Sequence, residues 1–176
     1  MNARNRPEVI AETNYLKLLR RGGWEYVERR KVSGIVAIVP LTPDDRLVLV
    51  EQYRPPVDRM VIELPAGLAG DMAGEEDERL EQAARRELLE ETGYQTRRLT
   101  RLFHGPVSAG ITSEDLTFFL ARNVEKVAAG GGDGSEAITV HTVPVARVSG
   151  WLRRQERSGK MVDVKVYAGL YAALIR

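Results

Sequence analysis

The sequence has no cysteine among its 176 residues, and only 6% of its residues are aromatic. The absence of cysteine excludes disulfide bonds, thiol catalysis and cysteine-ligated zinc. Charge of one sign is not in excess either, because 26 basic residues balance 25 acidic ones and leave a net charge of +1. Without a basic excess there is no bulk electrostatic attraction to nucleic acid, so we expect no nucleic-acid partner.

Long hydrophobic runs are also missing. The longest apolar runs, such as GIVAIVP at residues 34–40 and LVLV at 47–50, have the length of β-strands. A membrane-spanning helix needs about 20 apolar residues. The N-terminal stretch MNARNRPEVIAETNYLK has no apolar segment typical of a signal peptide. We therefore expect a cytoplasmic protein without a membrane partner.

What is present is the composition of a folded domain, with 43% apolar and 29% charged residues. The length suits one domain with a sizeable core. Alternating residues and paired glycines before residue 32 predict a strand hairpin, with strands at 9–18 and 24–29. We therefore divide the chain into an N-terminal strand region, 1–32, and a main domain, 33–176. In the main domain, strands are predicted at 35–41, 46–52, 61–64, 96–103, 116–121 and 137–145.

Helices are predicted at 78–92, at 146–156 and after Asp163, which suits a helix N-cap. Gly93 suits the position just past the end of the first helix. Strands, one helix, further strands and then helices follow one another along the chain. This order predicts an α+β fold, in which helices cover a mixed sheet.

The clearest helix ends in RELLEETGY, residues 86–94, which contains three glutamates. Glu87 and Glu91 are four residues apart and share a helix face with Glu90 nearby. Acidic side chains at a helix C-terminus cost about 0.3–1 kcal/mol each, because the helix dipole is negative there. A divalent cation would remove this cost, and Mg²⁺ and Mn²⁺ prefer such oxygen ligands. From the helix alone, a plain solvated acidic face remains the alternative.

The spacing around this helix resembles the Nudix box, G-x5-E-x7-R-E-U-x-E-E-x-G-U, in which U is an apolar residue. Glu78, seven intervening residues and then the stretch 86–94 match the box if Tyr94 counts as apolar. Met72 stands where the leading glycine is expected, and the resemblance makes Gly67 of the ELPAG segment at 63–67 the equivalent. The loop from Gly67 to Glu78 would then be five residues longer than in the box. The EQYR strand at 51–54 also resembles the ADP-ribose pyrophosphatase branch of the family.

The resemblance implies a Nudix fold, a mixed β-sheet sandwiched between α-helices, with an additional N-terminal antiparallel β-sheet. It also implies roles for residues of this chain. The implied ion is Mg²⁺, with Mn²⁺ as the alternative, and its implied ligands are Glu87, Glu91, Glu90 and the backbone carbonyl of Ala66. The residues implied to be structural within the motif are Gly67, Glu78, Arg86 and Gly93.

A catalytic carboxylate is implied on a mobile loop of such enzymes. Glu136, after the glycine-rich stretch at 128–135, is the first candidate. Glu114 is the alternative candidate, and Glu90 is a third carboxylate, which lies within the motif. Residues proposed to bind substrate are Arg54, whose guanidinium suits phosphate oxygens, and, with weaker support, Arg29, Arg30 and Trp24.

The activity implied is metal-dependent cleavage of the diphosphate linkage of a nucleoside diphosphate sugar, with ADP-ribose giving AMP and ribose 5-phosphate. Ala109 stands where a proline often accompanies ADP-ribose specificity, so other substrates stay open: a GDP-sugar, a dinucleoside polyphosphate or a capped RNA end. A binding module that senses ADP-ribose without cleaving it is the alternative from another class. The resemblance further implies a homodimer that exchanges N-terminal strands.

Overall fold

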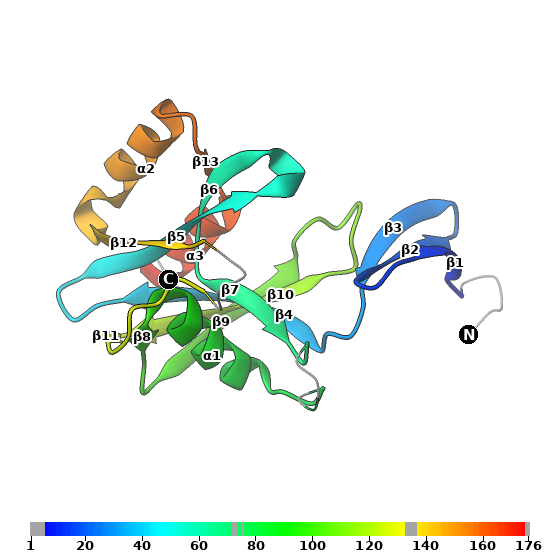
Figure 1. Ribbon diagram of the computed structural model, residues 1–176, viewed down its shortest axis with the longest axis horizontal. Helices are drawn as coiled ribbons and strands as arrows, with labels where there is room; N and C mark the ends of the chain where they lie inside the picture. The colour runs from blue at the N-terminus through cyan, green and yellow to red at the C-terminus, as the bar shows by residue number, and fades with distance from the viewer. Residues whose placement is uncertain (1–5, 72–73, 75, 133–136, 175–176) are drawn as a thin grey trace.

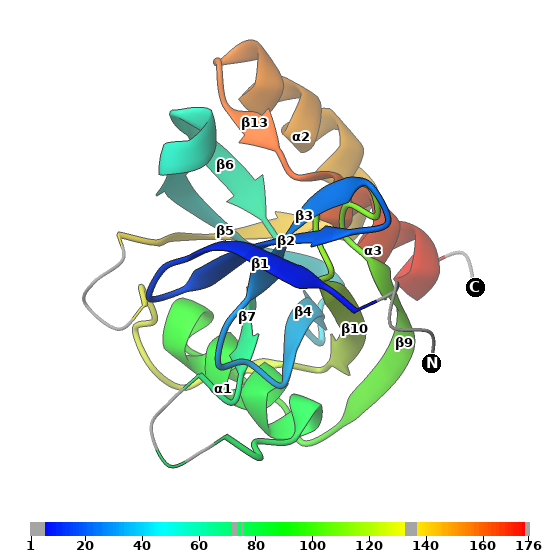
Figure 2. The ribbon, with the colours of Figure 1, turned by 90° about the vertical axis from the view of Figure 1, so that its right-hand side faces the viewer.

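The computed structural model describes residues 6–71, 74, 76–132 and 137–174. Figure 1 shows a main body of sheet and helices, from which a small N-terminal sheet projects to one side. Figure 2 looks at the molecule from the side of this projecting sheet.

The projecting sheet consists of β1 (Glu8–Glu12), β2 (Leu16–Arg21) and β3 (Trp24–Arg29), all antiparallel and in the order β1-β2-β3. The predicted hairpin between β2 and β3 is confirmed. The single strand predicted at 9–18 is wrong, because it is broken into β1 and β2. At the break, the Oγ1 of Thr13 accepts the amide hydrogen of Leu16 at 3.1 Å and so turns the chain.

The main body is built on a mixed sheet, which has eight strands within the described residues and the central order β13-β6-β5-β4-β10-β9. In addition, β12 pairs with β5 and β7 pairs with β4. The β10–β4 and β13–β6 pairs are parallel, and the other pairs are antiparallel. The strands are β4 (Gly34–Leu41), β5 (Arg46–Arg54), β6 (Arg59–Glu63), β7 (Ala66–Ala69), β9 (Leu99–Pro106), β10 (Asp115–Arg122), β12 (Thr139–Pro144) and β13 (Met161–Val162).

Helices cover both faces of this sheet. Alternate residues of β4 and β5 point to opposite sides and form two separate apolar clusters. One cluster includes Leu88 of α1 (Leu80–Thr92). The other includes Leu152 of α2 (Val148–Arg157) and Val166 of α3 (Val164–Leu174). The predicted α+β fold with a sandwiched mixed sheet is therefore confirmed.

The remaining elements are short. Two are 3-10 turns, η2 (Pro55–Val57) and η3 (Val145–Arg147). The other two, β8 (Tyr94–Gln95) and β11 (Glu125–Lys126), are strands that pair with each other. In the described part of the chain, no helix has both the length and the apolar character to cross a membrane.

Both ends of α1 are set by contacts. The helix begins at Leu80 rather than at the predicted residue 78, and the side chain of Gln82 accepts the amide hydrogen of Arg79 just before it. At the other end, Gly93 takes a left-handed conformation with φ of 70°.

The C-terminal carbonyls of α1 are capped by the segment that follows β11. The amides of Gly131 and Gly132 donate to the carbonyls of Glu91 and Glu90, at 2.9 and 3.1 Å. The Nζ of Lys126 donates to the carbonyl of Thr92 at 2.5 Å. This ammonium group lies at the negative end of the helix dipole, so it offsets part of the cost of the acidic residues there.

Gly93→Ala is expected to lower the free energy of unfolding by about 3 kcal/mol or more, because strain and overlap add. A Cβ at Gly93 would lie 2.1 Å from the carbonyl oxygen of Ala128, in a backbone with φ of +70°. Gly159→Ala is the matched control, since Gly159 has φ of +91° but no atom within 4 Å of the added Cβ. Its expected cost is about 1–2 kcal/mol. Urea denaturation measures the free energy of unfolding of both variants. Equal losses of stability in the two variants would show that the close approach of residue 128 to Gly93 is unimportant.

Candidate active site

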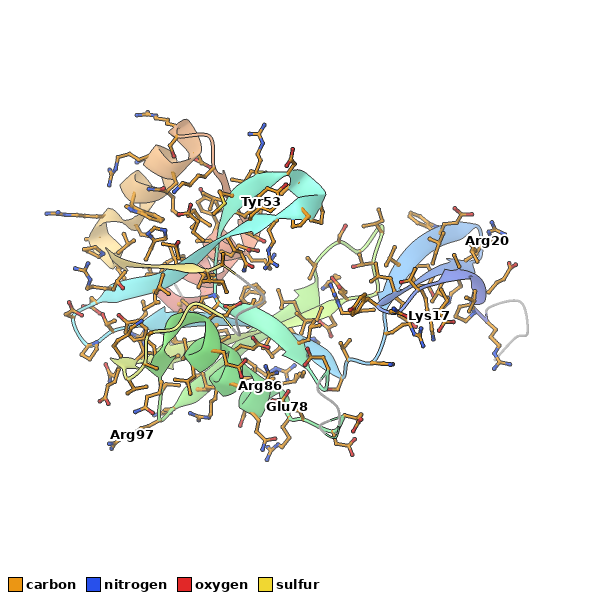
Figure 3. All side chains as sticks on the ribbon, viewed as in Figure 1. Lys17, Arg20, Tyr53, Glu78, Arg86 and Arg97 are labelled. Carbon is orange, nitrogen blue, oxygen red and sulfur yellow. The ribbon has the colours of Figure 1, made fainter. Side chains whose placement is uncertain are left out.

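Arg86 and Glu78 form the central ion pair of the region. The Nε and Nη2 of Arg86 donate to the two carboxylate oxygens of Glu78 at 3.1 and 3.0 Å. Nη2 also donates to the carbonyl of Leu68 at 2.8 Å, and the amide of Gly70 donates to Glu78 at 3.3 Å. Figure 3 labels both side chains beside α1. The pairing expected from their spacing is present, and it fastens the segment after β7 to the helix.

Glu87 is enclosed between Arg86 and the backbone of β7. The Nη1 of Arg86 donates to Glu87 Oε1 at 2.8 Å. A Cβ at Gly67 would lie 2.0 Å from the carboxyl carbon of Glu87, so only glycine leaves room for this side chain. Burial raises the pKa of the Glu87 carboxyl to about 7; Arg86 opposes the shift, and the charges of Glu90 and Asp71 add to it.

Glu91 and Glu90 have different surroundings. Glu91 is only 4% exposed, and its Oε2 accepts the amide hydrogen of Ala66 at 3.1 Å. The Glu90 side chain is 42% exposed and accepts from Arg86 Nη1 at 3.2 Å. Thus Glu87 and Glu91 both lie against β7, while Glu90 is at the rim.

This donor set fits a hard divalent cation in its chemistry. The buried carboxylate of Glu91 and the largely buried carboxylate of Glu87 lie beside the backbone of Ala66 and Gly67, and burial alone makes the Glu87 anion unfavourable. Carboxylate and carbonyl oxygens are the ligands that Mg²⁺ and Mn²⁺ prefer. Among the described residues, no three acidic or histidine side chains already converge on one point. The ligand set therefore stays a prediction.

Arg54 lies at the end of β5, where its Nε donates to Glu63 Oε2 at 2.7 Å. The Glu63 side chain is only 8% exposed, and its burial raises the pKa of its carboxyl despite the neighbouring guanidinium. Sequence reasoning assigned no role to Glu63. The feature of the sequence that could have pointed to Glu63 is its place in the ELPAG segment, nine residues after Arg54. The role of Arg54 toward substrate stays a prediction.

The other arginines proposed for substrate are Arg29, the last residue of β3, and Arg30, which follows it. Arg29 pairs with Glu114, and Arg30 pairs with Glu12 at 2.9 Å. Trp24 is 66% exposed beside the β2–β3 turn. Arginines 29 and 30 line a hollow of about 510 Å³, whose lining also includes Tyr15, Lys31, Leu68 and Asp71.

Asp71 connects this hollow to the helix, because its carboxylate lies 3.7 Å from Arg86 Nη2. Sequence reasoning did not single out Asp71, and the loop before Glu78 offers no motif that marks it. Glu136, proposed as a catalytic carboxylate, lies outside the described residues.

Comparison with known proteins agrees with this geometry. The model of the NUDIX domain matches residues 32–163, which is most of the chain. The chain belongs to the Nudix family. A Nudix ADP-ribose pyrophosphatase of Bacillus subtilis (strain 168) is 36% identical over 94 residues, 53% of this chain and 48% of that protein. The match thus spans about half the length of that relative.

Two other Nudix-type comparisons cover more of the molecule. The GDP-mannose pyrophosphatase of Salmonella arizonae (strain ATCC BAA-731 / CDC346-86 / RSK2980) is 32% identical over 158 residues, 82% of this chain and 80% of that protein. A crystal structure of an ADP compounds hydrolase superposes with a TM-score of 0.65 at 24% identity, covering 84% of this chain and 80% of the other. At that identity, the structural likeness supports the Nudix fold.

Gly67→Ala is expected to weaken Mn²⁺ binding by about tenfold or more while the protein stays folded, because the new Cβ displaces the Glu87 carboxylate. Isothermal titration calorimetry measures the affinity, and circular dichroism checks the fold. Gly105→Ala is the control, since no atom lies within 4 Å of a Cβ added there. Unchanged Mn²⁺ affinity in Gly67→Ala would exclude Glu87 as a ligand.

Metal affinity should also depend on pH through Glu87. Its carboxyl has a pKa of about 7 without metal, and a proton must leave before the oxygens can bind a cation. Apparent Mn²⁺ affinity should therefore fall by up to about tenfold per pH unit below 7 and level off above it. Glu87→Gln should remove this dependence near pH 7. If the Mn²⁺ affinity of the wild-type protein changed instead with a midpoint near pH 4.5, the ordinary pKa of glutamate, the prediction would be contradicted.

Proposed function

We propose that this Nudix protein is a divalent-metal-dependent hydrolase that cleaves the diphosphate linkage of a nucleoside diphosphate sugar. ADP-ribose is the proposed substrate, with AMP and ribose 5-phosphate as products. The observation that carries the proposal is the pair of carboxylates on α1, buried Glu91 and largely buried Glu87, held against the backbone of Ala66 and Gly67. Mg²⁺ is the proposed ion, and Mn²⁺ is the alternative.

Glu87, Glu91, Glu90 and the carbonyl of Ala66 would hold the ion. When bound, it supplies positive charge for the diphosphate oxygens and makes an attacking water more acidic. Hydrolysis forms a bond from the water oxygen to one phosphorus and breaks the bridging P–O bond. Glu136 is the proposed acceptor of the water proton, with Glu90 and Glu114 as the other carboxylates put forward for catalysis.

The charge of the hollow supports an anionic substrate. Arg29, Arg30 and Lys31 are among its lining residues, together with Asp71, whose carboxylate lies 3.7 Å from Arg86 Nη2. Guanidinium groups bind phosphate oxygens well. Arg54 is proposed to bind phosphate, and Trp24 to stack on the base.

A GDP-sugar is the second candidate substrate, and a specific observation favours it. The relative named GDP-mannose pyrophosphatase aligns over 82% of this chain, whereas the relative named ADP-ribose pyrophosphatase aligns over 53%. The latter has the higher identity, 36% against 32%. Ala109 stands in place of the proline that often accompanies ADP-ribose specificity, and this weakens the case for ADP-ribose.

We also infer a homodimer in the cytoplasm, with residues 1–32 as the dimerisation region and 33–176 as the catalytic domain. The projecting sheet supports the dimer, because Leu19 is the one buried hydrophobic residue within β1–β3, all of which is described. A three-stranded sheet needs an apolar face packed on a partner to be stable. A second copy of the chain is the proposed partner.

Assaying purified protein with Mg²⁺ against ADP-ribose, GDP-mannose and a dinucleoside polyphosphate tests the function. We expect AMP and ribose 5-phosphate from ADP-ribose. Glu91→Gln should lower kcat by about 100-fold or more, because it removes an anionic metal ligand. Glu81→Gln is the matched control, since this exposed glutamate lies in the first turn of the same helix.

The possible results separate the alternatives. Faster hydrolysis of GDP-mannose would favour the second candidate. Binding of ADP-ribose by calorimetry without any product would support a non-cleaving sensor. Equal rates for wild type and Glu91→Gln would contradict the proposed metal site.

A further inference from the structure

The loop at 107–114, which joins β9 to β10, is bound along the outer edge of β3. The amide of Val27 donates to the carbonyl of Ile111 at 2.8 Å, and the amide of Ser113 donates to the carbonyl of Val27 at 3.1 Å. Val27 and Thr112 form a parallel bridge. In both Figure 1 and Figure 2, this loop reaches from the main body to the projecting sheet. The loop thus pairs with the edge of the N-terminal sheet through one isolated bridge.

A side-chain ion pair reinforces this contact. The Nε and Nη2 of Arg29 both lie 2.9 Å from Glu114 Oε1, although the two residues are 85 positions apart. The side chain of Glu114 is 19% exposed and that of Arg29 is 36% exposed. Hydrogen bonds between charged groups are stronger than neutral ones, and partial burial protects them from solvent screening. Arg29 and Glu114 therefore fasten the base of the loop to the end of β3.

The clamped loop lies on the side of the molecule that holds the hollow. It leads into β10, where Leu116 pairs with Ile35 of β4, and Ile35 in turn pairs with Leu68 of β7. Leu68 and Arg29 both line the hollow. The hollow is thus lined by Arg29 of the clamp and by Leu68, whose carbonyl accepts a hydrogen bond from the motif arginine, Arg86.

We propose that Arg29 and Glu114 are positioning residues: their ion pair fixes the loop at 107–114 against β3 and so braces the wall of the substrate hollow to which Arg29 belongs. Glu114 then has a structural contact, and it is not the proton acceptor of the reaction. Loss of the pair would loosen the wall and weaken substrate binding, and the chemical step would continue. The predicted effect on substrate binding rests on the proposed function. The contact between Arg29 and Glu114 does not depend on it.

Hydrogen exchange tests the clamp without any assay of activity. In Arg29→Gln and in Glu114→Gln, we expect the amides of Val27 and Ser113 to exchange about fivefold faster or more than in wild type. The reciprocal variant, Arg29→Glu with Glu114→Arg, should restore much of the protection. Arg20→Gln is the matched control, because Arg20 pairs with Glu25 within the same sheet and away from the loop. Unchanged exchange in both single variants would overturn the clamp.

Kinetics with ADP-ribose then separates positioning from catalysis. Each single variant should raise KM by about fivefold and leave kcat within about twofold, and the reciprocal variant should bring KM back toward wild type. A loss of kcat of about 100-fold in Glu114→Gln, without rescue by the reciprocal variant, would overturn the proposal and make Glu114 catalytic.

If the wild-type protein binds ADP-ribose but does not cleave it, the dissociation constant replaces KM in this comparison. Faster amide exchange and a rescued dissociation constant would then support the clamp, while the proposed hydrolase function alone would fail. A dissociation constant that stays the same in both single variants would overturn the role in substrate binding.

Discussion

The ion pair between Arg86 and Glu78 is the interaction on which the rest of the site depends. It fixes the segment after β7 to α1 at both ends, through Glu78 and through the carbonyl of Leu68. This places Gly67 so close to Glu87 that no Cβ fits between them. The same guanidinium also contacts Glu87 and lies near Asp71, so one side chain organises both the buried carboxylates and the edge of the hollow.

The acidic end of α1 is unfavourable by itself, and the fold compensates for it without removing the acidic groups. The ammonium of Lys126 and the amides of Gly131 and Gly132 cap the carbonyls at this end. Burial still raises the pKa of the Glu87 carboxyl to about 7. The remaining unfavourable energy is concentrated on the carboxylates themselves, where a cation would relieve it.

Local patterns predicted much of the fold, because strands and helices follow from the spacing of apolar residues. The main sheet, α1 and the N-cap at Asp163 were found in this way, and Asp163 Oδ1 accepts the amide hydrogen of Lys165 at 2.8 Å. The first strand was predicted wrongly, since Thr13 turns the chain within an otherwise alternating stretch. The eight-residue spacing of Glu78 and Arg86 led to the expectation of a contact within one helix; the contact is present, but Glu78 lies before α1, which begins at Leu80.

The sequence by itself determined the class of fold and the family resemblance, since both depend on patterns within short segments of the chain. Only the tertiary structure decided that Arg29 meets Glu114, that Arg54 meets Glu63 and that Glu87 is buried against Gly67. These contacts join distant segments, and their energies depend on burial and exact distance. No local pattern encodes either quantity, because both arise when the sheet brings β3, β7 and α1 together.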